Sequence, residues 1–399
     1  MNSLLIVLLI VVFIALLGVG VIAPVLAVFA TDLGATGLTL GLIIATFPLV
    51  RGLTLPVVGG LSDRKGRKVF MLVGLGIYAV AGLLFTFAGS VLHLVPIRIL
   101  QGLGSAMVIP MAMAYTGDMA PEGQEGRYMG FLNIASFVGF GGGPLLGGVL
   151  RDLFGVESVF YGMFFCSVAA LVLVLFLVPS RRHKAVVKDQ EGLFVTFRKM
   201  LKNRKVLGVL LSRMATMMIM MPTMAFLPIL MTQLMDSSGI EIGIVIGIRT
   251  LVNALFQPFF GRLADRSNKL KLLLMGSFVV GITMFFVPFP RSLPVLIALF
   301  VVMGVGEALV WPVLGAYAIE EGRRYGQGSM MGVFNMAVSA GVFLSSSMAG
   351  LFMDLFGLGF AFYSIGLIVI ISAVAASWMI VTGERAIAAS RAGGDREGG

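Results

Sequence analysis

Charged side chains lie inside long apolar stretches of this 399-residue sequence, and they are the residues best suited to chemistry. The acid among them is Glu307, and the four bases are Arg51, Arg98, Arg213 and Arg249. Each would cost about 2.5–3.5 kcal/mol at the centre of a lipid bilayer, so they must face one another or a wet interior. A carboxyl near an arginine can exchange between a protonated and a paired state, which would let Glu307 carry a proton. The alternative is a static ion pair with Arg249 or Arg51 that locks helices together.

Polar side chains accompany these charges at helical spacing. Arg249, Asn253 and Gln257 recur every four residues and would share one helix face, as would Glu307 and Trp311. Methionines crowd the segment at 206–231, where flexible thioethers suit a pocket of many shapes, although most should fill the core or face lipid. Proton coupling is expected from Glu307, Arg249, Arg98 and Asp118, and substrate contacts from Arg51, Arg213, Asn253, Gln257, Trp311, Met217, Met221 and Gln101.

Membrane helices must hold these residues in place. Hydrophobic residues make up 58% of the chain and charged residues 12%, whereas a soluble domain is about one quarter charged. A span takes about 20 apolar residues, so the chain has room for about twelve spans with their connections. We therefore predict an all-α integral membrane protein with twelve transmembrane helices. The apolar segments are 4–30, 38–60, 69–90, 94–117, 128–150, 158–179, 206–231, 239–260, 271–289, 293–318, 328–350 and 358–382.

The remaining composition excludes other classes of protein. Cys166 is the only cysteine, and His93 and His183 are the only histidines, so neither a disulfide nor a histidine metal site is expected. The sequence carries no nucleotide-binding loop and no catalytic constellation, which argues against an ATP-driven pump and against an enzyme. We attribute the net charge of +10 to basic cytoplasmic loops and not to nucleic-acid binding.

Basic residues fall mostly on one side of the predicted bundle. Only Arg151 and Arg291 lie in connections on the other side, which predicts a cell-membrane protein with both termini in the cytoplasm. The basic segment 181–205 is expected to be a tether along anionic lipid headgroups. It separates two predicted helix bundles, 1–180 and 206–384, and the polar tail 385–399 is expected to be disordered.

The second half of the chain repeats the first at an offset of 202 residues. The sequence DLFG at 152–155 returns at 354–357, and Asp-Arg at 63–64 returns at 265–266. Six spans per half start both halves on the same side of the membrane. The halves should therefore be two six-helix bundles related by a pseudo-two-fold axis along the membrane normal.

Two stretches have a pattern with a physical meaning. In GGLSDRKGRK, 59–68, an aspartate can accept hydrogen bonds at a neighbouring helix N-terminus, and the bases can pair with Asp118. In 130–148, glycines recur every four residues beside a proline, which suits either a gate or generic close packing. The loop residues are Gly59, Asp63, Arg64, Gly66 and Arg67, with Asp265 and Arg266 in the repeat. The glycine-rich set is Gly139, Gly143, Pro144, Gly147 and Gly148.

These motifs resemble those of the major facilitator superfamily. The loop fits that family's signature, and LVPIRILQGLGSA at 94–106 fits a second one through Arg98 and Gln101. The sequence 130–148 is similar to the antiporter motif of drug:proton exporters. In the repeat of this motif, serines replace Gly-Pro, an asymmetry between the halves that such exporters share. One feature departs from them, because the first segment has no acid before Asp32.

The resemblance implies a secondary active transporter that works by alternating access and needs no cofactor beyond a proton gradient. We expect proton-coupled efflux of small amphipathic compounds or drugs, by a monomer whose partners are its substrate, protons and lipid. The alternative is an organic-anion importer or facilitator, because four interior arginines face a single interior acid.

Overall fold

A computed structural model describes residues 3–119, 125–179, 193–325 and 327–397, which are helical throughout except for short connections. The helices of the first half are α1 (Ser3–Asp32), α2 (Gly37–Lys65), α3 (Arg67–Thr86), α4 (Val91–Met119), α5 (Glu125–Phe154) and α6 (Val156–Leu177). The second half contains α7 (Leu193–Lys202), α8 (Arg204–Met218), the π-helix η1 (Pro222–Phe226), α9 (Leu227–Met235), α10 (Gly239–Arg266), α11 (Lys269–Phe286), α12 (Leu293–Tyr325), α13 (Gln327–Phe356) and α14 (Leu358–Glu397).

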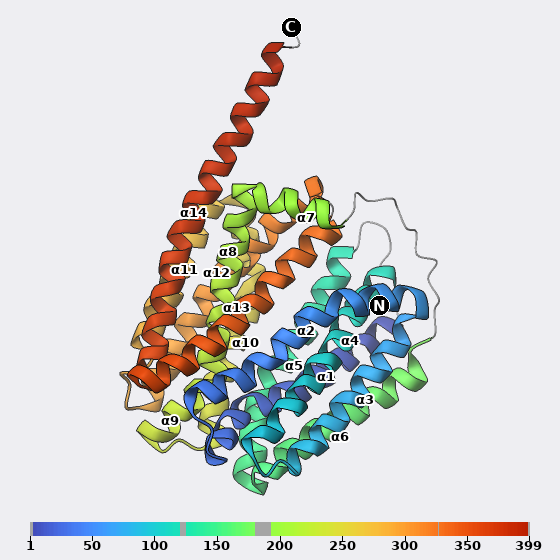
Figure 1. The fold of residues 1–399 in the computed structure, drawn as a ribbon, viewed down its shortest axis with the longest axis vertical. Coiled ribbons are helices and arrows are strands. Elements are labelled where there is room, and N and C mark those ends of the chain that lie inside the picture. Colours follow the sequence, from blue (N-terminus) through green and yellow to red (C-terminus); the bar gives the residue numbers. More distant parts are fainter. Residues whose placement is uncertain (1–2, 120–124, 180–192, 326, 398–399) are drawn as a thin grey trace.

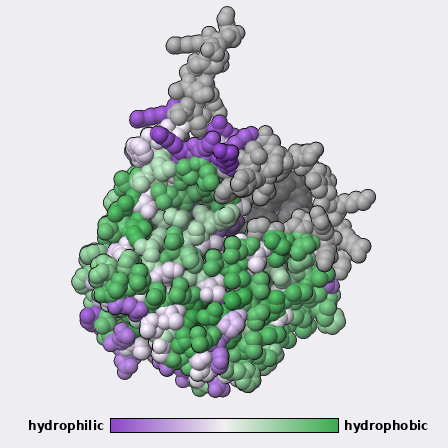
Figure 2. Space-filling model, viewed as in Figure 1, coloured by the Kyte–Doolittle hydropathy of each residue, from purple (hydrophilic) through white to green (hydrophobic). Residues whose placement is uncertain are grey.

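Twelve helical segments of the described chain are long and apolar enough to cross a membrane. They match the twelve apolar segments, so the predicted fold class is confirmed. Figure 2 shows apolar side chains over the middle of the molecule and hydrophilic residues gathered near its ends. One end carries the turn at Gly66, the connection 267–268 and α7; we call it the basic end. The opposite end, which carries the connections 33–36 and 236–238, is called the far end.

The helix contacts repeat with the sequence. In the first half α1 packs against α5 and α6, while α4 packs against α2 and α3. In the second half α8 packs against α13 and α14, and α12 packs against α10 and α11. These are the same pairs shifted by one repeat, and Figure 1 shows them as two bundles. Two further pairs, α5 with α10 and α13 with α2, join the halves and exchange under the same shift.

The halves meet at the far end and separate toward the basic end. A Cβ added at Gly243 of α10 would lie 2.6 Å from the Pro144 carbonyl oxygen of α5, so these backbones touch across the boundary. Near the basic end, a Cβ added at Gly130 of α5 or at Gly332 of α13 would meet no atom within 4 Å.

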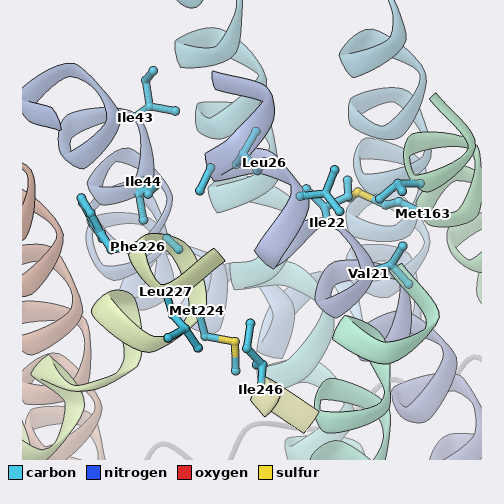
Figure 3. Close-up of a cluster of buried hydrophobic side chains, with 14 of the residues drawn as sticks. Val21, Ile22, Leu26, Ile43, Ile44, Met163, Met224, Phe226, Leu227 and Ile246 are labelled. Atoms are coloured by element: carbon cyan, nitrogen blue, oxygen red, sulfur yellow. The ribbon is translucent and has the colours of Figure 1, made fainter. Parts of the chain in front are cut away.

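A shared apolar cluster fills the closed part. Figure 3 shows Ile22 and Ile44 of the first half in the same cluster as Phe226 and Ile246 of the second. These four side chains are at most 3% exposed. Burial of apolar surface therefore stabilises the junction between the halves at the far end.

Three local features differ from expectation. The predicted span 206–231 is broken, because Pro222 has no N–H for the helical ladder and the chain continues as η1. Part of the tether forms α7, which buries Met200 against the second half. The tail predicted to be disordered continues α14 to Glu397, in keeping with the helix preference of its Ala, Arg and Glu residues.

Candidate functional site

A buried polar cluster lies inside the second half. Glu307 and Arg249 are each 5% exposed, and Glu307 Oε2 lies 3.7 Å from Arg249 Nε. Arg249 also donates a hydrogen bond to Thr223 Oγ1. Asn253 Nδ2 donates to Glu307 Oε2 over 3.2 Å, and Gln257 Nε2 donates to Asn253 Oδ1 over 2.9 Å. The cluster thus pairs the deep acid with one arginine and extends along α10 toward the basic end.

Three local features of the sequence assemble this cluster. The four-residue spacing along α10 places the polar side chains on one face. Gly304 lets α12 approach α10, since a Cβ there would lie 2.6 Å from the Arg249 carbonyl oxygen, and Glu307 follows one turn later. The π-helix at Pro222 turns Thr223 toward Arg249.

Arg213 on α8 lies between aromatic rings near this cluster. Its guanidinium carbon is 4.8 Å from the Trp311 ring centroid and 4.9 Å from that of Phe334. Both contacts fit cation–π attraction. Trp311 in turn lies 5.5 Å, centroid to centroid, from Phe137 of the first half. Arg213 Nε and Trp311 Nε1 are buried donors without a hydrogen-bond partner among the described residues.

Arg98 has a structural role in the first half. Its Nη2 donates to the Ile44 carbonyl over 3.1 Å and its Nη1 to Gln101 Oε1 over 2.8 Å. Pro48 lacks the N–H that would otherwise bond the Ile44 carbonyl in α2. Arg98 therefore satisfies an acceptor that the proline leaves open. The hydrogen bond to Ile44 ties α4 to α2, whereas the one to Gln101 stays within α4. The structure does not bring Arg98 to Glu307.

Arg51 occupies the repeat position of Asn253 and lies near Tyr78 on α3. The Tyr78 hydroxyl hydrogen-bonds Ser105, which is the repeat position of Glu307. Arg51 Nε is buried and has no hydrogen-bond partner among the described residues. The acid–base pair of the second half therefore has no counterpart in the first, where Phe47 and Ser105 occupy the positions of Arg249 and Glu307.

The remaining predicted residues lie in different places. Met217 packs beside Gly341 of α13 and is 4% exposed, while Met221 is partly buried in the apolar cluster. Gly66 has φ 92°, a conformation that favours glycine, in the turn between α2 and α3. Arg67 begins α3, Arg266 is exposed at the end of α10, and the region around Gly59 is open. The side chains of Asp63, Arg64, Asp118 and Asp265 lie outside the described residues.

The glycine-rich helix α5 packs closely on two of its faces. A Cβ at Gly139, Gly143 or Gly147 would collide with α1 of the same half, so this stripe serves close packing within the bundle. Pro144 and Gly148 instead lie against α10 of the other half. The contact between halves thus belongs to the neighbouring face and not to the stripe.

No group of three or more His, Cys, Asp or Glu side chains that could hold a metal ion occurs in the described part of the chain. The buried polar residues of the described chain are mostly serines and threonines, with the amides Gln101 and Asn253 and the charged pair Arg249 and Glu307 inside the helices. Two repeated helix bundles around such groups define a membrane transporter of small molecules.

The chain belongs to the Major Facilitator Superfamily, whose family model matches residues 8–235 and 207–397. The sequence-based resemblance to this family is therefore confirmed, and with it the expectation of a transporter and not an enzyme.

The similar proteins are transporters whose names describe different functions. An uncharacterized MFS-type transporter of Methanocaldococcus jannaschii is 30% identical over 87% of this chain and 90% of the relative. Quinolone resistance protein NorA of Staphylococcus aureus is 32% identical over 38% of this chain and 39% of its own length. Among solved structures, an inward-facing, unoccupied bacterial homolog of the human lysosomal transporter Spinster has a TM-score of 0.82 at 15% identity, over 96% of this chain and 97% of that one. The human organic anion transporter MFSD10 has a TM-score of 0.67 at 17% identity, over 94% and 100%.

Proposed function

We propose that this protein is a proton-coupled exporter of small amphipathic compounds or drugs, and that Glu307 carries the proton. The observation that carries the proposal is the cluster around Glu307, a buried carboxylate paired with Arg249 inside apolar helices. Hydrogen-bonded amides lead from it to Gln257, which is half-buried. The partial similarity to NorA supports efflux.

The basic end faces the cytoplasm in this proposal, because Lys and Arg gather on the cytoplasmic side of membrane proteins. Both termini then lie inside the cell, the protein sits in the cell membrane, and the structure is open inward. A single chain forms the whole path, so we propose that the monomer is the working unit.

Protonation of Glu307 would remove its charge and weaken its attraction to Arg249. Arg249 would then be free to take other partners, and helices α10 and α12 would lose an ionic contact. The aromatic rings of Trp311, Phe334 and Phe137 offer apolar surface to a substrate near this point. The proton on Glu307 and the substrate against the aromatic rings can thereby bind at neighbouring places in alternation.

Transport in reconstituted vesicles tests the proposal. Vesicles with an acidic lumen should accumulate a fluorescent amphipathic compound, and collapsing the pH gradient should release it. Glu307→Gln should abolish the accumulation, whereas Glu157→Gln, which removes an exposed carboxylate of α6, should not. Accumulation that ignores the gradient in the wild-type protein would contradict the proposal.

An organic-anion transporter is the second candidate. Arg51, Arg213 and Trp311 each carry a buried N–H donor that has no partner within the described part of the chain, and a carboxylate or phosphate would supply acceptors. A thermal-shift series with lipophilic cations, neutral compounds and organic anions separates the two candidates. Stabilisation by anions alone, with uptake driven by an alkaline lumen, would favour this second function.

A further inference from the structure

Two aspartates make the same contact across the boundary between the halves. Asp152, at the far end of α5, accepts hydrogen bonds from the backbone N–H groups of residues 239–240 over 2.8 and 2.7 Å. Asp354, at the far end of α13, accepts them from residues 37–38, both over 2.7 Å. Each carboxylate uses both oxygens, and the two contacts exchange under the repeat.

The N–H groups involved are the first two of a helix, which have no partner inside it. A local cap serves the third in both helices: Thr36 accepts from Thr39 in α2, and Ser238 accepts from Glu241 in α10. The helix ends therefore divide their donors between a residue of their own half and an aspartate of the other. A carboxylate is also favoured by the positive end of a helix dipole.

Glycines allow these aspartates to reach the helix starts of the other half. A Cβ at Gly148 would collide with the Gly239 carbonyl, and a Cβ at Gly350 would collide with the Gly37 carbonyl. In each case the aspartate follows its glycine by one helical turn, at Asp152 or Asp354. Close backbone contact and a charged hydrogen-bond acceptor thus occur together at both contacts between the halves, α5 with α10 and α13 with α2.

We propose that Asp152 and Asp354 are paired latches that hold the far end closed, and that opening this end requires both to release. The far end cannot open while helix starts of one half are bound to helix ends of the other. This proposal concerns the balance between conformations and holds whatever the substrate or coupling ion is.

Distance measurements between spin labels test the latches. Labels at Gly89→Cys and Arg291→Cys, in Cys166→Ser protein, would report opening, because both sites are exposed at the far end and belong to different halves. Asp152→Asn and Asp354→Asn each replace one acceptor oxygen by a donor. Hydrogen bonds to charged groups are the stronger ones, so each single variant should raise the ratio of open to closed populations about tenfold. The double variant should shift it further.

Glu157→Gln is the matched control, since it removes an exposed far-end acid that makes neither contact, and it should leave the distances unchanged. Thermal unfolding establishes that each variant is folded, and each single variant keeps one latch should the double variant fail to fold. Unchanged distance distributions in folded single variants would overturn the proposal. Lost proton coupling with normal latching would instead count against the proposed function alone.

Discussion

Glu307 and Arg249 depend on each other because both side chains are only 6% exposed. Removing one partner of a buried ion pair leaves an uncompensated charge. We predict that Arg249→Met lowers the free energy of unfolding by about 3–5 kcal/mol. The double variant Arg249→Met, Glu307→Gln should recover most of that loss. Denaturation of the wild type, Arg249→Met, Glu307→Gln and the double variant in one detergent measures the coupling.

The pair formed by Lys269 and Glu320 is the control for this prediction. Its side chains are 26% and 40% exposed, and surface pairs contribute at most about 1 kcal/mol. Lys269→Met should therefore cost far less than Arg249→Met. Equal losses for both variants, or a double variant no better than Arg249→Met, would mean that Glu307 and Arg249 are not coupled.

Arg213 separates the two candidate functions. Lysine keeps the charge at this position but loses the planar guanidinium that lies over Trp311 and Phe334. If the substrate is an organic anion, Arg213→Gln should weaken its binding about tenfold or more, with Arg213→Lys intermediate. Binding of lipophilic cations should not weaken. Titration of each compound class into the three proteins provides the measurement.

The stripe on α10 could be predicted because four-residue spacing fixes a helix face regardless of tertiary structure. The partner of Glu307 could not be chosen between Arg249 and Arg51, because that depends on how α10 and α12 pack. Thr223 was missed because a π-helix shifts the register of its helix. The acceptor of Arg98 could not be predicted, because it is a carbonyl that Pro48 leaves open on another helix.

The approach of α5 to α10 predicts a sharp effect of small substitutions. Gly148→Ala should push the two helices apart at the far end and cost about 1–3 kcal/mol of closed-state stability. Gly142→Ala on the same helix is the control, because its Cβ would meet only Leu17 at 3.6 Å, an ordinary contact. Spin-label distances across the far end should lengthen for the first variant alone. Equal distances in both variants would contradict the contact.

Helix existence and order were predictable from apolar length, but helix ends and breaks were not. The sequence around Pro222 is one apolar span by hydropathy, which does not register the backbone N–H that the proline lacks. The helix α7 forms inside a segment whose charge alone suggested a tether, because Met200 has an apolar surface to pack against. Amphipathic spacing in LFVTFRKMLK was the available signal.

The repeat at 202 residues predicted the architecture of the whole molecule, and the helix pairs within and between the halves follow it. It could not predict which end is closed. Both conformations of such a transporter use the same helices and the same sequence, and they differ by a small free energy. The repeated DLFG sequence was visible as a duplication, yet its function across the boundary required the packed structure.

Substrate-induced proton release is the most direct test of proton coupling through Glu307. An amphipathic compound that the protein binds is added to purified protein in weakly buffered detergent. A pH-sensitive dye then records the protons released. We predict release from the wild-type protein and from Glu157→Gln, and none from Glu307→Gln, although that variant should still bind the compound. Proton release from Glu307→Gln equal to that of the wild type would contradict the account and leave Glu307 as a static counter-ion of Arg249.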